Sequence, residues 1–146
     1  MTRGQIAIIV KDYKEKHILT STEFNGDMYM KGGYGQLAVN ALKRSKDVAR
    51  YQYEVAKFNL NHHHYNDLDA LTYKLKEDCL DFTKDYFQNW FSDYVYIKNL
   101  TLTEVAIKTS LRDDDGRDIG NKEVILKPKA IAVLCFGRLV KLIEEE

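Results

Sequence analysis

Proline, cysteine and long hydrophobic runs are scarce in this chain of 146 residues, which has one proline and two cysteines. No apolar run approaches the ~20 residues that a membrane-spanning helix needs, so we expect no membrane partner. The N-terminus has no apolar signal core or small-residue cleavage site, which predicts no secretory signal. Both absences favour a cytoplasmic protein.

Excess charge is also lacking, because 22 Lys and Arg balance 22 Asp and Glu. Nucleic-acid binders usually carry a basic excess, so the neutral balance makes that class less favoured. The composition is 45% hydrophobic and 30% charged, which predicts one folded domain over residues 1–146.

Cys79 and Cys135 lie in apolar runs and favour buried thiols, although a disulfide between them is also compatible with the sequence.

Motifs for catalysis are missing as well. The sequence contains no Gly-x-Ser-x-Gly, His-Glu-x-x-His or Cys-x-x-Cys. Cysteines in apolar surroundings should stay protonated and inert. We therefore expect a protein that is not an enzyme and holds no cofactor.

Two segments suggest metal binding, but their patterns are poor. His62–His64 are consecutive and point in different directions on any regular backbone, which favours a solvated loop, with a makeshift site beside nearby carboxylates left open. Asp113–Asp118 resembles a calcium loop, but Leu111 and Lys122 stand where that loop needs acidic residues around Gly116. We expect a hairpin turn there and no metal site.

The apolar periodicity predicts an α+β domain. Gln5–Val10 and His17–Phe24 read as a strand hairpin, and Gly35–Leu60 and Asn66–Trp90 read as helices. Period-two patterns predict four later strands, at Tyr94–Lys98, Leu102–Leu111, Glu123–Lys127 and Ala130–Phe136. Leu139–Glu146 fits either a final strand or a short helical tail. The predicted fold is a mostly antiparallel sheet with two antiparallel helices packed on it, in the order ββ-αα-ββββ.

The Asn66–Trp90 segment has two apolar seams when it is read as a helix. The main seam comprises Leu68, Leu71, Leu75, Cys79, Phe82, Tyr86 and Trp90. Tyr73, Leu80 and Phe87 recur every seven residues on nearly the opposite side. Because one seam is enough to dock a helix, the second predicts a surface for another chain, most simply a homodimer. The alternative is that the Gly35–Leu60 helix or the C-terminal tail covers this second seam within the monomer.

A basic stripe marks the predicted first helix, where Lys43, Lys46, Arg50 and Lys57 share a face. Three interpretations stay open. The stripe is a solvated face with Asp47 and Glu54 as local partners, a site for an acidic protein, or a site for nucleic acid.

The glycine-rich segment 26–36 is the most conspicuous predicted loop, with Met28, Tyr29 and Tyr34 among its glycines. Tyrosine supplies low-entropy contact area at interfaces, and the chain has ten tyrosines, so these side chains are candidates for partner contact. Backbone amides at the start of the following helix could instead bind a phosphate. A small-molecule or nucleotide-binding protein, or an enzyme, that uses this loop is therefore an alternative.

The first forty residues resemble small uncharacterised phage and prophage proteins. The matching pieces are Thr2-Arg3, Ile6–Val10, His17–Glu23, Phe24-Asn25-Gly26 and Gly32–Leu37. The chain departs from that pattern at Asn25, where an acid is usual, and at Asp27-Met28, which replaces Tyr-Pro. The resemblance implies a phage origin and a location in the host cytoplasm.

Together these features predict an interaction protein, with the resemblance suggesting a phage-encoded inhibitor of a host protein such as a defence nuclease. The candidate contacts are the spare seam, the basic stripe and the tyrosines and methionine of the glycine-rich loop. A nucleic-acid binder that uses the basic stripe is the remaining alternative.

Overall fold

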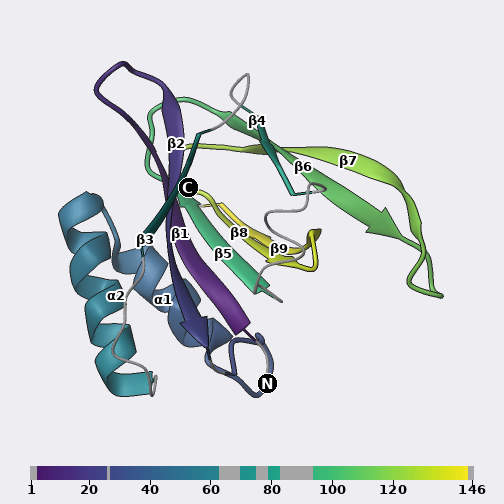
Figure 1. Cartoon of the computed structure of the whole chain (residues 1–146), viewed down its shortest axis with the longest axis horizontal. Coiled ribbons are helices and arrows are strands. Elements are labelled where there is room, and N and C mark those ends of the chain that lie inside the picture. The colour runs from purple at the N-terminus through teal and green to yellow at the C-terminus, as the bar shows by residue number, and fades with distance from the viewer. Residues whose placement is uncertain (1–2, 26, 63–69, 75–78, 83–93, 145–146) are drawn as a thin grey trace.

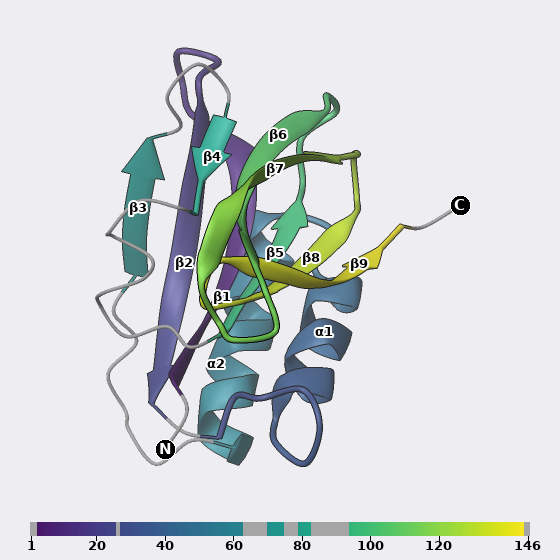
Figure 2. The same cartoon turned by 90° about the vertical axis from the view of Figure 1, so that its right-hand side faces the viewer.

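A computed structural model describes residues 3–25, 27–62, 70–74, 79–82 and 94–144. This part of the chain forms three layers (Figures 1 and 2). Two helices cover one face of a six-stranded sheet, and a three-stranded sheet packs on the other face. The predicted α+β class with mostly antiparallel strand pairing is confirmed, although the strands form two sheets where one was expected.

The six-stranded sheet has the order β3-β2-β1-β5-β8-β9. Its strands are β1 (Arg3–Lys11), β2 (His17–Asn25), β3 (Ala70–Lys74), β5 (Tyr94–Asn99), β8 (Ile131–Cys135) and β9 (Arg138–Ile143). Strands β1 and β2 form the predicted hairpin, and β1 runs parallel to β5 at the centre. The C-terminal segment, for which strand and helix were both open, is a strand paired with β8.

The three-stranded sheet has the order β4-β6-β7, with β4 (Cys79–Asp81), β6 (Val105–Arg112) and β7 (Asp118–Leu126). Strands β6 and β7 are joined by the turn predicted at Asp113–Gly116. The Asp113 carboxylate accepts hydrogen bonds from the Asp115 and Arg117 amides at 3.0 and 2.9 Å. That carboxylate therefore shapes the turn itself.

The core lies on both faces of the central strands. In β1, Ile6 and Ile8 pack toward the helices, whereas Ala7 and Ile9 pack toward the three-stranded sheet. A strand buried on both faces needs no polar alternation, which explains its continuous apolar run. Strand β8 has the same two-sided burial, as its sequence predicted.

The long helix predicted at Asn66–Trp90 is wrong, because the described part of that range forms strands at 70–74 and 79–81 and no helix. Strand β3 pairs with β2, and β4 pairs with β6. Leu80 and Phe82 are both buried in the core at the two-residue spacing of a strand. Short apolar runs fit either period, and here pairing with distant strands decides the structure.

The helix predicted at Gly35–Leu60 is two helices, α1 (Gly35–Arg44) and α2 (Val48–His62), which lie side by side (Figure 2). The Ser45 hydroxyl donates to the Ala41 carbonyl at 2.8 Å, at the end of α1. The Asp47 carboxylate accepts the Arg50 amide at 2.7 Å and caps the start of α2. These two polar side chains stabilise the break.

A buried lysine fixes the end of α1 against the sheet. Lys98 of β5 is only 3% exposed, and its ammonium donates to the Leu42 and Ser45 carbonyls at 2.9 and 2.8 Å. The last carbonyls of a helix lack intrahelical donors and carry partial negative charge, so a cation there is favourable. Lys98 therefore holds α1 at the point where the chain turns.

A buried tyrosine docks α2 in a similar way. The Tyr51 hydroxyl donates to the Ile6 carbonyl of β1 at 2.5 Å and lies 3.1 Å from the Thr22 hydroxyl of β2. Both helices are thus joined to the sheet by polar contacts within the apolar layer.

Neither helix of the described chain combines the length and the apolarity required to cross a membrane.

We expect Lys98→Met to lower the free energy of unfolding by about 1–3 kcal/mol, because two buried carbonyls lose a charged donor. Urea denaturation followed by circular dichroism would measure the change. Lys122→Met, at an exposed position on β7, is the control and should have little effect. Equal losses in the two variants would contradict a capping role for Lys98.

Candidate partner-binding surface on the helical hairpin

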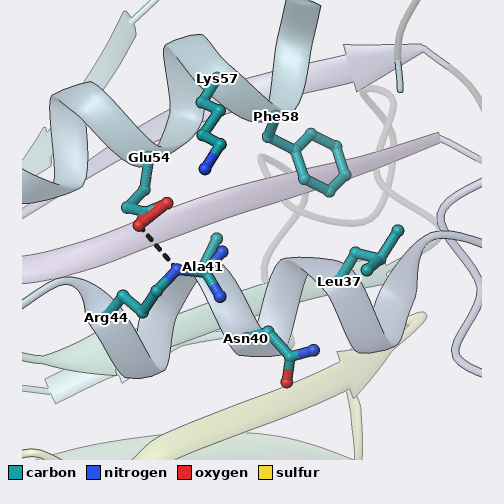
Figure 3. Close-up of a pocket in the computed structure, with 7 residues that line it drawn as sticks. All are labelled: Leu37, Asn40, Ala41, Arg44, Glu54, Lys57 and Phe58. Carbon is teal, nitrogen blue, oxygen red and sulfur yellow. Dashed lines mark hydrogen bonds and ion pairs between the residues drawn. The ribbon is translucent and has the colours of Figure 1, made fainter. Parts of the chain in front are cut away.

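A shallow groove of about 80 Å³ lies between α1 and α2. Figure 3 shows side chains from both helices facing each other across it. Its lining residues are Leu37, Asn40, Ala41, Arg44, Glu54, Lys57 and Phe58. Pockets that enclose a small molecule usually measure 300 Å³ or more, so the groove suits surface contact better than enclosure.

The groove contains a carboxylate held between two arginines. The Arg44 Nε donates to Glu54 Oε1 at 2.7 Å from α1, and the Arg50 guanidinium donates to the same oxygen at 3.0 Å from within α2. The Glu54 side chain is 1% exposed, whereas both arginine side chains are about half exposed. One buried negative charge therefore holds two cations at the surface.

The pKa of Glu54 reports this arrangement. Burial alone would raise the pKa of the carboxyl, but hydrogen bonds and positive charge, first from Arg44 and then from Arg50, lower it below its ordinary value. Glu54 is therefore ionised at neutral pH. It links α1 to α2 by a charge-assisted contact.

The four residues of the predicted basic stripe are all exposed, but the break between the helices redistributes them. Lys43 lies in the last turn of α1, Lys46 in the connection, and Arg50 and Lys57 on α2. Residues 35–62 carry five Lys and Arg against two Asp and Glu, although the whole chain is neutral. The four cations are thus distributed over both helices and the connection between them.

Exposed apolar side chains accompany these cations. Tyr53 is 53% exposed and Leu60 is 80% exposed on α2, and Leu37 of α1 is exposed beside the groove. The Arg50 guanidinium lies 4.7 Å from the centre of the Tyr53 ring, a cation–π contact. Aromatic and arginine side chains are enriched at protein-contact surfaces.

Sequence reasoning missed Arg44, Tyr53, Leu60 and Leu37. If one helix continued through Ser45, Arg44 would lie on a different face from the basic stripe. Because α1 ends at Arg44, the side chain of Arg44 contacts Glu54 of α2 instead. The available signal was Ser45 followed by Asp47, two residue types that favour helix ends. Glu54 was expected to be a local partner of the basic stripe, and its ion pair with Arg50, four residues earlier, confirms this.

Two predicted partner contacts are buried within the chain itself. Leu80 is 3% exposed in the core between the sheets, and Met28 is fully buried beneath α1 and α2. Neither side chain offers surface to a partner in this structure, because 79–81 is a strand whose alternate residues face the core. The side chain of Tyr73 and all of Phe87 lie outside the described part of the chain.

The glycine-rich loop packs against the sheet and α2. Tyr29 and Tyr34 are half-buried, and the Tyr34 ring meets Phe58 edge-on at 6.5 Å. The Tyr34 and Gly35 amides donate to the Asp27 and Tyr29 carbonyls, so these amides do not converge on an anion site. A Cβ at Gly35 would overlap the Tyr96 hydroxyl, which gives this glycine a packing role.

The metal hypothesis has little to support it in the described residues. Within them no three His, Cys, Asp or Glu side chains cluster closely enough to hold an ion. His62 ends α2, but its side chain is outside the described structure, as are His63 and His64. Cys79 and Cys135 are half-buried thiols.

No protein-family model matches the chain, and neither a curated protein nor a solved structure shows significant similarity to it. The function is therefore inferred from the geometry and charge of the helical hairpin. This hairpin carries exposed cations with exposed apolar side chains among them.

We expect Glu54→Gln to lower the free energy of unfolding at neutral pH by about 1–3 kcal/mol, because the amide keeps the shape but loses the charge-assisted bonds. The folded-state pKa of Glu54 lies below its ordinary value of 4.5. Its stabilisation is therefore complete above that value and is lost as the pH falls through the folded-state pKa. Urea denaturation at a series of pH values should show the two proteins converging in acid.

Glu104→Gln, at an exposed position, is the control and should unfold like the parent protein at neutral pH. A difference between the parent and Glu54→Gln that stays constant from neutral to acid pH would show that the charge of Glu54 does not stabilise the fold.

Proposed function

We propose that the protein is a non-enzymatic interaction module whose helical hairpin binds an acidic region of a partner protein. The observation that supports this most is the buried Glu54, which holds Arg44 and Arg50 beside the exposed Lys46 and Lys57. Fixing cations before binding reduces the entropy that a partner must overcome.

The shape of the groove between α1 and α2 favours a protein over a small ligand that needs enclosure. The groove is shallow, and exposed apolar side chains lie next to the charges. Phosphate contacts need cations alone, whereas an acidic protein surface also offers apolar area to cover Tyr53 and Leu60. Both kinds of side chain therefore have a partner in an acidic protein.

The role of a phage-encoded inhibitor of a host protein, which the N-terminal resemblance implies, is the narrower form of this proposal. An inhibitor acts by covering a surface of its target and needs no catalytic residues. A preorganised cationic hairpin suits that mode of action, since its charges also speed the encounter with an acidic target.

The test compares two triple variants with the same change of charge. Lys43→Glu, Lys46→Glu and Lys57→Glu reverse the hairpin surface, and Lys14→Glu, Lys16→Glu and Lys122→Glu reverse exposed lysines elsewhere. The probes are poly-L-glutamate and a DNA duplex of about 20 base pairs, each titrated at several salt concentrations.

We expect the hairpin variant to lose about tenfold or more in affinity for poly-L-glutamate, because like charges then face the probe. The control variant should lose much less. Equal losses would contradict the proposal, since net charge alone would then explain binding. Tighter binding of the duplex, abolished by the hairpin variant, would favour the nucleic-acid alternative instead.

A further inference from the structure

The outer face of α2 carries a second apolar stripe, formed by Ala49, Tyr53, Ala56 and Leu60. The spacing of four, three and four residues is that of a coiled-coil seam. The stripe lies opposite the buried side of the helix, where Tyr51, Val55 and Phe58 pack on the sheet. Tyr53 and Leu60 are largely exposed, so α2 is apolar on two sides and covered on one.

The dimensions of this stripe fit a single helix. Its eleven helical steps span about 16 Å, or roughly three turns. Small residues alternate with large ones along it, and Ala49 and Ala56 permit the close approach that helix pairs need. A partner helix can therefore place its own apolar side chains between Tyr53 and Leu60.

The charges beside the stripe define the chemistry of that helix. Arg50 and Lys57 are seven residues apart, so they lie about 10 Å apart along the same flank of the stripe. Gln52 occupies the other flank and is uncharged. Acidic residues spaced by seven on a partner helix would meet both cations at once.

A second copy of this chain fits the stripe poorly. An antiparallel pair of α2 helices would set Arg50 and Lys57 of each copy against the same cations of the other. A parallel pair would set them against Gln52, which offers no charge. Charge complementarity therefore favours an acidic helix of another protein.

We propose that α2 receives one acidic amphipathic helix of the partner along Ala49, Tyr53, Ala56 and Leu60, with its carboxylates on Arg50 and Lys57. This inference rests on the proposed function and specifies the structure of the acidic region. The hairpin groove then forms the edge of the contact, where Arg44 adds positive charge.

The test uses a designed peptide of about three heptads, with Leu and Ala at the seam positions and Glu at both flanking positions. Its like charges keep it from pairing with itself, and a matched peptide carries Lys in place of Glu. Binding to the full-length protein is measured by fluorescence anisotropy. Tyr53→Gln, Leu60→Gln and Lys57→Glu test the site, and Leu102→Gln, at another exposed leucine, is the control.

We expect the acidic peptide to bind about tenfold or more tightly than the basic one. Tyr53→Gln and Leu60→Gln should each weaken it about tenfold, whereas Leu102→Gln should not change it. Lys57→Glu should weaken the acidic peptide and strengthen the basic one, a reversal that loss of folding cannot produce.

Unchanged binding in Tyr53→Gln and Leu60→Gln would overturn the helix-docking inference. If the three-lysine hairpin variant still lost binding to poly-L-glutamate in that case, the proposed function would stand without the helix-docking inference. If neither set of variants changed the binding of acidic probes, both the inference and the proposed function would fail.

Discussion

The turn between α1 and α2 is the constraint on which the hairpin surface depends. Lys98 binds the carbonyls at the end of α1, Asp47 caps the start of α2, and Glu54 joins the helices through Arg44 and Arg50. Lys98 and Asp47 add hydrogen bonds at the two helix ends, and Arg44 and Arg50 compensate the buried charge of Glu54. Glu54 also holds Arg44 and Arg50 at the surface, so the stability of the fold and the proposed binding share these residues.

Local sequence patterns predicted much of the sheet. The β1–β2 hairpin, the two-sided burial of β8 and the turn at Asp113–Gly116 follow from β-branched runs and turn residues, and the structure contains all three. The segment after α2 was misread because its apolar residues fit both a helical and a strand period. Strands β3 and β4 form by pairing with β2 and β6, contacts that local periodicity does not encode.

The candidate site was predicted in part, for a related reason. The exposed cations Lys43, Lys46, Arg50 and Lys57 were found from their spacing alone. Arg44 and the outer stripe with Tyr53 and Leu60 were missed, because one continuous helix places them differently relative to the sheet. Whether Leu80 faces the core or a partner depends on which element it belongs to, and that element was assigned wrongly.

The contact between Arg44 and Glu54 carries the central claim, and a double-mutant cycle measures it directly. The cycle compares the free energies of unfolding of the parent protein, Arg44→Ala, Glu54→Gln and the double variant. If the buried carboxylate joins α1 to α2, the two changes should be coupled by about 1–3 kcal/mol, because the second change then removes a contact already lost. Additive effects, within about 0.3 kcal/mol, would show that the helices are positioned without this contact and would contradict the account.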